Sequence, residues 1–169
     1  MAWKRIVNAS PLIFLTRLGL LDLLNEPGLV VMVPSAVLAE LSDLDPDDPA
    51  AVAARSADWI QVVPAPPAPD FLRARKLGPG ETSVLALAIA ETEAMTTAEN
   101  QVEVILDDGK ARRFAEGIGL RVQGTLALLL VGKQTGQIDA VRPLLERLRA
   151  SGMHLFDEVM RRVLALAGE

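Results

Sequence analysis

The chain has 169 residues, of which half are hydrophobic and 23% are charged. This composition is typical of one globular domain, and it excludes disorder along most of the length. The net charge of −5 excludes a wholly basic protein that coats nucleic acid, although a local basic patch remains compatible with it.

The apolar segments are too short to cross a membrane. The longest, residues 122–132, is about half of the roughly 20 residues that a bilayer helix needs. The amino terminus begins like a signal peptide, but Asn8 and Pro11 interrupt its apolar run, and no small-residue cleavage site follows. We therefore expect a cytoplasmic protein that has no membrane partner.

Strands and helices alternate along the predicted chain. Five short apolar runs predict strands, at residues 5–8, 29–33, 59–63, 102–106 and 119–123. Helices are predicted at residues 11–18, 20–24, 35–41, 50–58, 81–93, 109–116 and 125–134, with two more in the last thirty residues. Ser10-Pro11 is typical of a helix start and Gly19 of a helix end. The alternation predicts an α/β fold, in which a parallel sheet is covered by helices on both faces.

Acidic and amide side chains fall where such a sheet binds its ligands, beyond the carboxyl ends of its strands. Asn8 ends the first predicted strand, and Asp107 and Asp108 end the fourth. Glu40 lies on the helix after the second strand, and Glu81 opens the helix that leads to the fourth. These four acids and one amide are expected to converge on one edge of the sheet.

Such a cluster predicts a divalent metal. Carboxylates held close together repel one another unless a cation neutralises them. With no cysteine and one histidine, the chain can offer a metal mainly oxygen ligands, which suit Mg²⁺, Mn²⁺ or Ca²⁺. A bound Mg²⁺ lowers the pKa of its water and stabilises charge on a phosphate, so metal-assisted phosphodiester hydrolysis is the chemistry best supported by these residues.

Each of these residues also has a purely structural interpretation. Asp107-Asp108 could be a strand end followed by a helix N-cap, and Glu81 suits the first turn of a helix. Asn8 could simply hydrogen-bond the following turn. Glu40 is the stronger functional candidate, because its helical face should be largely covered and a lone buried carboxylate is costly.

Basic residues gather beside the predicted acidic cluster. Two groups stand out, Arg73, Arg75 and Lys76 before the Glu81 turn, and Lys110, Arg112 and Arg113 after the Asp107-Asp108 pair. A nuclease needs such cations to hold the phosphate backbone, but they could also form a solvated helix face. Only 4% of the residues are aromatic, so little base stacking is expected.

Four segments, in this order, resemble the PIN-like domain superfamily: IVNASPLIFL, VPSAVLAEL, GPGETSVLALA and VILDDGKARRFAEGIGL. Residues 119–169 closely resemble one subgroup of small bacterial and archaeal proteins, which are related to VapC-type toxins and are often predicted to bind nucleic acid. The similarity covers essentially the whole chain. It implies a single PIN-like domain over residues 1–169, in which residues from about 125 to 169 pack on the domain or extend it.

The resemblance implies a three-layer α/β/α fold, with a central parallel sheet of about five strands, and a ribonuclease that depends on Mg²⁺ or Mn²⁺. The implied catalytic residues are Glu40, Glu81 and Asp107. The implied metal ligands are the same three residues together with Asn8 and Asp108. Ser10, Lys110, Arg112 and Arg113 are the expected contacts to RNA. The implied reaction leaves a 5′-phosphate and a 3′-hydroxyl.

Two positions depart from the family pattern. Asn8 replaces the first acid, and Ser83 stands where many relatives carry an acid. The leading hypothesis is the ribonuclease toxin of a toxin–antitoxin pair, whose partners would be RNA, an antitoxin and a second copy of the chain. The alternative is a PIN-like module that binds RNA or a protein without cleaving. A receiver-like phospho-acceptor is a third hypothesis, disfavoured because no acidic pair follows the first strand.

Overall fold

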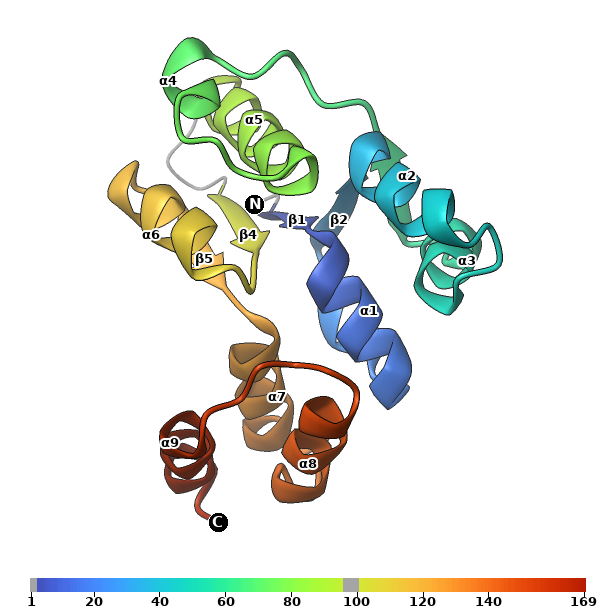
Figure 1. Cartoon of the computed structure of the whole chain (residues 1–169), viewed down its shortest axis with the longest axis vertical. Coiled ribbons are helices and arrows are strands. Elements are labelled where there is room, and N and C mark those ends of the chain that lie inside the picture. Colours follow the sequence, from blue (N-terminus) through green and yellow to red (C-terminus); the bar gives the residue numbers. More distant parts are fainter. Residues whose placement is uncertain (1–2, 96–100) are drawn as a thin grey trace.

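The computed structural model describes residues 3–95 and 101–169 (Figure 1). Its strands are β1 (Trp3–Val7), β2 (Leu29–Pro34), β3 (Ile60–Val63), β4 (Gln101–Ile105) and β5 (Arg121–Gln123). They form one sheet in the order β3-β2-β1-β4-β5, and every neighbouring pair is parallel. The predicted parallel sheet is therefore confirmed.

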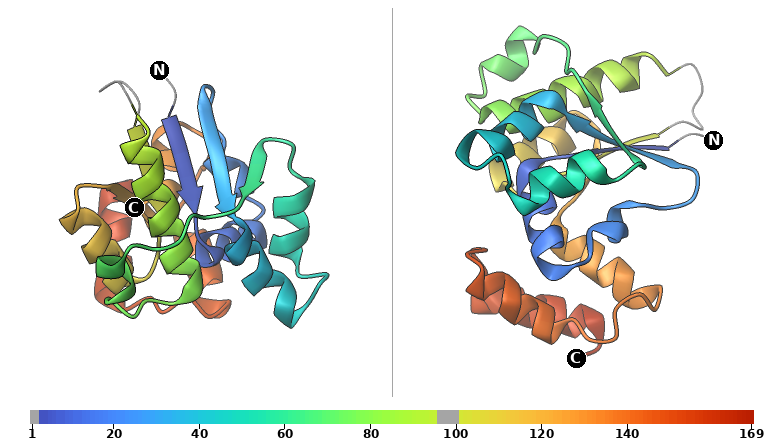
Figure 2. Two further views of the ribbon diagram at one scale, coloured as in Figure 1. Left: turned by 90° about the horizontal axis from the view of Figure 1, so that it is seen from above. Right: turned by 90° about the vertical axis from the view of Figure 1, so that its right-hand side faces the viewer.

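Helices cover both faces of this sheet, as Figure 2 shows in its right-hand view. They are α1 (Ala9–Leu18), η1 (Leu21–Leu24), α2 (Ser35–Leu44), α3 (Pro49–Ser56), α4 (Asp70–Arg73), α5 (Pro79–Glu93), α6 (Gly109–Gly117), α7 (Thr125–Gln134), α8 (Arg142–Ala150) and α9 (Asp157–Ala167). Helix α5 lies on one face, while α1, α7, α8 and α9 lie on the other, and α2 packs against α1, α3 and α5. The three-layer α/β/α architecture expected from the sequence is confirmed. Within the described ranges, no helix is long and apolar enough to cross a membrane.

The central strands are buried on both faces, because helices pack against each side of them. Ile6 and Val7 of β1, Val33 of β2, and Val104 and Ile105 of β4 have no exposed surface. Strands in this position are expected to be continuously apolar rather than alternating, as the sequence 29–33 is. The hydrophobic core therefore lies on both sides of β1, β2 and β4.

The strand order reverses at β1, and this creates the place where a ligand site is expected. The chain moves from β1 to β2 and β3 on one side, and returns to β4 and β5 on the other. In open parallel sheets, ligands bind at such a reversal, beyond the carboxyl ends of the strands. The backbone N–H of Asn8 donates to the carbonyl of Ile105 at 3.2 Å, so the ends of β1 and β4 are held together. This order also differs from the 2-1-3-4-5 order of receiver-like domains, which disfavours the third hypothesis.

Several element ends differ from the sequence prediction. Helix α1 begins at Ala9 with Asn8 in the N-cap position, so the predicted N-cap at Ser10, with Pro11 as the first helical residue, was wrong by two residues. The predicted end is confirmed, because Gly19 adopts the left-handed conformation with φ of 71°. The short helix α4 was not predicted, since its four residues carry too little periodicity to be distinguished from a loop.

Candidate metal and nucleic-acid site

Three predicted site residues meet at the amino-terminal end of α5. Asn8 follows β1 and is 2% exposed, and its Nδ2 donates to Glu81 Oε1 at 3.1 Å. Glu40, on α2, accepts a hydrogen bond at Oε1 from the Gly80 N–H at 2.8 Å. Residues from β1, α2 and α5 are thereby joined by the first turn of α5.

Gly80 allows these side chains to approach one another. A Cβ placed on Gly80 would lie 2.4 Å from Glu40 Oε2 and 2.9 Å from Asn8 Oδ1, which is too close for either atom. The two oxygens therefore converge on the same point above the Gly80 backbone. A Cβ on Gly78 would similarly lie 2.3 Å from Glu81 Oε2. The Gly-Pro-Gly segment thus leaves space for these flexible side chains to approach the backbone, and neither glycine has a positive φ.

The electrostatics of this group favour a cation. Burial raises the pKa of Glu40, and the Glu81 carboxylate raises it further, while the Gly80 N–H opposes the shift. Asn8 Oδ1 is buried and has no hydrogen-bond partner among the described residues. A buried acceptor of this kind costs free energy unless a donor or a cation satisfies it. An acceptor next to a carboxylate, with no donor between them, is what an oxygen-ligated metal requires.

Asp107 belongs to a second, neighbouring group. Its Oδ1 accepts the Thr125 N–H and its Oδ2 accepts the Thr125 hydroxyl, both at 2.7 Å. Burial raises the pKa of Asp107, and the bonds from Thr125 and the charge of Arg112 act against that rise. Thr125 begins α7 and is completely buried. This threonine was missed in the sequence, although a Gly-Thr pair before an apolar helical run was the available signal.

Two other residues are occupied by local hydrogen bonds. Asp108 is the N-cap of α6 and accepts the Ala111 N–H at 2.8 Å, as the structural interpretation of this residue expects. The Ser83 hydroxyl donates to the Gly80 carbonyl at 2.8 Å within α5. Each side chain is thus tied to the backbone of its own helix and not to Asn8 or Glu40.

The donor set around Gly80 fits Mg²⁺ or Mn²⁺. Within the described part of the chain, no three histidine, cysteine, aspartate or glutamate side chains form a group that could hold a metal. Mg²⁺, however, needs only one or two carboxylates and completes its shell with waters and phosphate oxygens. Two carboxylates and one unpartnered amide oxygen, from Glu40, Glu81 and Asn8, meet that requirement.

Three of the predicted RNA contacts, Lys110, Arg112 and Arg113, lie on α6, and they face two different places. Arg112 lies beside Asp107, because a Cβ on Gly124 would lie 2.7 Å from Arg112 Nη1 and 3.0 Å from Asp107 Oδ1. Lys110 and Arg113 line a different cavity together with Arg75. Ser10 is half-buried in the first turn of α1, two residues after Asn8.

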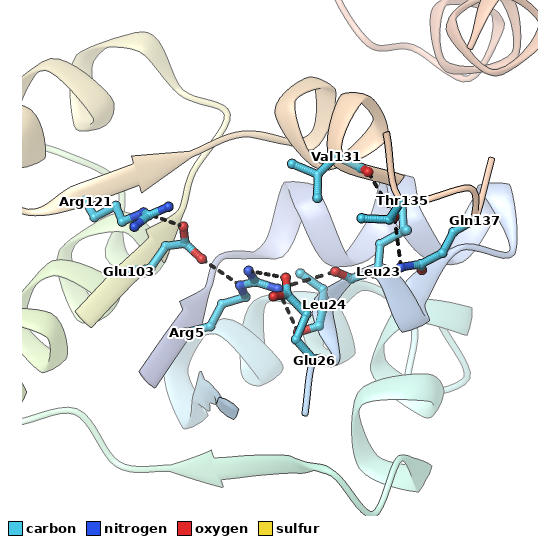
Figure 3. Close-up of polar contacts among 9 residues, drawn as sticks. All are labelled: Arg5, Leu23, Leu24, Glu26, Glu103, Arg121, Val131, Thr135 and Gln137. Atoms are coloured by element: carbon cyan, nitrogen blue, oxygen red, sulfur yellow. Dashed lines mark hydrogen bonds and ion pairs between the residues drawn. The ribbon is translucent and has the colours of Figure 1, made fainter. Parts of the chain in front are cut away.

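A buried network of charges in the sheet was also missed (Figure 3). Arg5 of β1 and Glu103 of β4 are 3% and 2% exposed, and Arg5 Nε donates to Glu103 Oε2 at 2.8 Å. Arg5 also bonds Glu26 and the carbonyls of Leu23 and Leu24. The signal was a charged residue in the middle of each of two apolar strands. The network has no unpaired charge, so it is a structural feature and not a second metal site.

Comparisons with known proteins agree with this architecture. A family model described as a PIN domain matches residues 4–169, which is nearly the whole chain. No curated protein matches the chain.

Proposed function

Since the chain belongs to the PIN domain family over residues 4–169, we propose that it is a metal-dependent endoribonuclease and the toxin component of a toxin–antitoxin pair. The observation that carries the proposal is the convergence of Asn8 Oδ1 and Glu40 Oε2 on one point at the first turn of α5. This point lies at the strand-order reversal, where ligands of parallel sheets bind. A nuclease-like fold and an oxygen-only donor set support the same chemistry.

Each side chain at this end of the sheet has a separate role in the proposed reaction. Asn8, Glu40 and Glu81 would hold Mg²⁺ or Mn²⁺, and Gly80 leaves room for the ion's remaining ligands. Such an ion, when bound, activates water and stabilises negative charge on a phosphate. Asp107 is held in one orientation by Thr125, so it would fix a water or a phosphate oxygen beside the metal. We assign Asp108 to the cap of α6, where it acts on the metal only through the position of Asp107.

RNA would be held by the cations of α6 and by the first turn of α1. Arg112 lies beside Asp107 and would neutralise the phosphate that is cleaved. Lys110 and Arg113 would hold neighbouring phosphates, and the Ser10 hydroxyl would contact a phosphate oxygen near Asn8. Phosphate contacts fix the position of the strand but do not read its sequence.

The proposed function also bears on the domain organisation, the protein partners and the cellular location. The family match over residues 4–169 supports one PIN-like domain, in which α7, α8 and α9 pack on the sheet through α1 and η1. An antitoxin and a second copy of the chain are the proposed protein partners, and the apolar residues Phe156, Val159 and Leu166 around α9 offer them an exposed surface. A toxin that cleaves cellular RNA acts in the cytoplasm, where we place this protein.

The decisive experiment combines cleavage and metal binding. Wild-type protein should cleave RNA with Mg²⁺ or Mn²⁺, and Asp107→Asn should lower the rate at least about a hundredfold and relieve growth arrest. Calorimetry with Mn²⁺ should show one site, which Glu40→Gln removes and Glu93→Gln, at the exposed far end of α5, retains. Unchanged Mg²⁺-dependent cleavage by Asp107→Asn would contradict the catalytic assignment.

Two observations favour the alternative, a PIN module that binds RNA or a protein without cleaving. Asn8 brings no negative charge to the site. Ser83 stands where many relatives carry an acid, and its hydroxyl donates to the Gly80 carbonyl. Under this alternative, RNA binds with equal affinity in EDTA and in Mn²⁺, and no Mn²⁺ site is found by calorimetry. Binding of millimolar Mn²⁺ that is lost in Glu40→Gln contradicts it.

A further inference from the structure

A cavity of about 350 Å³ lies between α6 and the segment that follows α4. We call the end of the sheet that carries Asn8, Glu40, Glu81 and Asp107, the residues proposed above to act with the metal, the metal edge. Its walls include Arg75, Leu77, Lys110, Arg113, Phe114 and Ile118. Its volume falls within the range of roughly 300–1,000 Å³ that is typical of small-ligand pockets. The cavity thus has the size of a pocket for one small group, and its walls combine cations with apolar side chains.

The apolar part of the cavity is a stack of flat groups. The guanidinium carbon of Arg75 lies 5.1 Å from the centre of the Phe114 ring. Phe71, which is 51% exposed and does not itself line the cavity, places its ring 6.3 Å from that of Phe114, inclined by 34°. Aromatic rings and guanidinium planes are the surfaces on which unpaired bases stack, whatever their sequence. The sequence predicts little base stacking from its few aromatic residues, but the fold brings two of them, Phe71 and Phe114, together at this place.

The cations of the cavity lack acidic partners. Among the residues that the structure describes, Arg75, Lys110 and Arg113 make no ion pair. Lys110 Nζ reaches only the Lys76 carbonyl, at 3.5 Å. In a chain with a net charge of −5, three uncompensated cations around one cavity are suited to an anion with several negative charges. A phosphodiester strand is such an anion, and its bases match the stacked rings.

The cavity is joined to the metal edge by two short segments. Arg75 and Leu77 line it, and the chain reaches Gly80 three residues after Leu77. Helix α6, which supplies the other wall, begins immediately after Asp107 and Asp108. Arg112 is on the same helix as Lys110 and Arg113, and its guanidinium lies beside Asp107. A strand held in the cavity would therefore pass Arg112 before its next phosphates reach the metal edge.

Building on the ribonuclease function proposed above, we propose that this cavity is a subsite for one unpaired nucleotide of single-stranded RNA. The base would stack on the Arg75–Phe114 pair, either on the outer face of the guanidinium or in its place over the ring, and Lys110 and Arg113 would bind the flanking phosphates. The subsite would fix the register of the strand, and thereby choose which phosphodiester lies at the metal edge. A base paired within a duplex cannot enter, so the cavity selects single strands.

Equilibrium binding in EDTA tests this subsite separately from cleavage. A labelled single-stranded RNA should bind the wild-type protein, and Phe114→Leu should weaken binding roughly tenfold, because one stacked base is lost. Arg75→Gln, a change at an exposed residue, should weaken it similarly. Phe156→Leu is the matched control, since Phe156 is 73% exposed and lies outside the cavity. Lys110→Gln and Arg113→Gln should each lower the slope of log affinity against log salt by about 0.7.

An RNA in which one nucleotide lacks its base tests whether Phe114 contacts that base. An RNA that lacks one base at the bound position should lose affinity for the wild-type protein but not for Phe114→Leu. Equal RNA affinity of Phe114→Leu, Arg75→Gln and Phe156→Leu would overturn the subsite and leave the ribonuclease assignment intact. Equal binding of duplex and single-stranded RNA would also overturn it. Absence of RNA binding in every variant and in the wild type, or preference for an acidic peptide, would overturn both proposals.

Discussion

Asn8 is the residue that most changes what the carboxyl edge of the sheet can bind. An aspartate at this position would bring a third carboxylate next to Glu40 and Glu81. The amide instead donates from Nδ2 to Glu81 and leaves Oδ1 unpartnered and buried. The site therefore keeps an oxygen ligand and loses one repulsive charge, so the ion-free site is less strained and its attraction for a divalent ion is weaker.

Gly80→Ala tests whether the close approach of these oxygens matters for metal binding. The new Cβ would lie 2.4 Å from Glu40 Oε2, so the flexible carboxylate must move away. We expect Mn²⁺ affinity, measured by calorimetry, to fall roughly 10- to 100-fold. Stability should not fall for helical reasons, because alanine is favoured over glycine in a helix by about 1 kcal/mol.

Gly117→Ala is the matched control for this change. Gly117 ends α6, and a Cβ there would meet nothing within 4 Å. This variant should bind Mn²⁺ like the wild type. If Gly80→Ala also binds Mn²⁺ with unchanged affinity, the oxygens around Gly80 do not form the metal site.

Among the helices and strands, the ends were predicted best where local residues alone determine them. The bounds of α7 were predicted correctly, because Gly124 precedes an uninterrupted apolar helical run. The parallel sheet followed from the alternation of strands and helices, without knowledge of any contact. The start of α1 was displaced because Ser10-Pro11 is a strong local signal, whereas the chain already turns at Asn8.

The division of the predicted acids into two groups could not be derived in this way. Asp107 and Asp108 follow a strand end, Glu81 lies in the first turn of α5, and Glu40 lies in the middle of the helix that follows β2, so the topology alone brings them to one edge. Which side chains meet depends on the Gly78–Gly80 turn, which draws Glu40 and Glu81 together, and on Thr125, which holds Asp107. These are contacts between segments far apart in the sequence, and local patterns carry no information on them.

Two substitutions of Asp108 can distinguish a helix cap from a metal ligand. Its Oδ1 accepts the Ala111 N–H, and asparagine caps helices as well as aspartate does. Asp108→Asn should therefore retain stability and Mn²⁺ affinity, while Asp108→Ala should lose about 1 kcal/mol in urea unfolding. A clear loss of Mn²⁺ binding in Asp108→Asn, with unchanged stability, would instead show that the carboxylate charge serves the metal.

For the whole molecule, the buried pair of Arg5 and Glu103 connects the layers. Arg5 lies on β1 and Glu103 opposite it on β4, and Arg121 of β5 contacts Glu103 at 3.3 Å. Arg5 also binds the carbonyls of η1, so the strands of the sheet and the segment before β2 share one guanidinium. Removing one member of a buried pair leaves the other charged and without its partner, which costs more than the pair itself contributes.

Glu103→Leu should therefore destabilise the protein by about 3–5 kcal/mol in urea unfolding, and the double variant Arg5→Leu/Glu103→Leu should be less destabilised than the sum of the two single changes. Glu26→Gln is the control, since this partner of Arg5 is 49% exposed and should contribute less than about 1 kcal/mol. Arg5 and Glu103 lie within β1 and β4, whereas the proposed metal ligands follow the end of β1 or lie on α2 and α5, and neither Arg5 nor Glu103 bonds any of them. Glu103→Leu should therefore leave Mn²⁺ affinity unchanged while the protein is folded. A Glu103→Leu variant as stable as Glu26→Gln would mean that apolar packing around β1 and β4 holds the layers together without the buried charges.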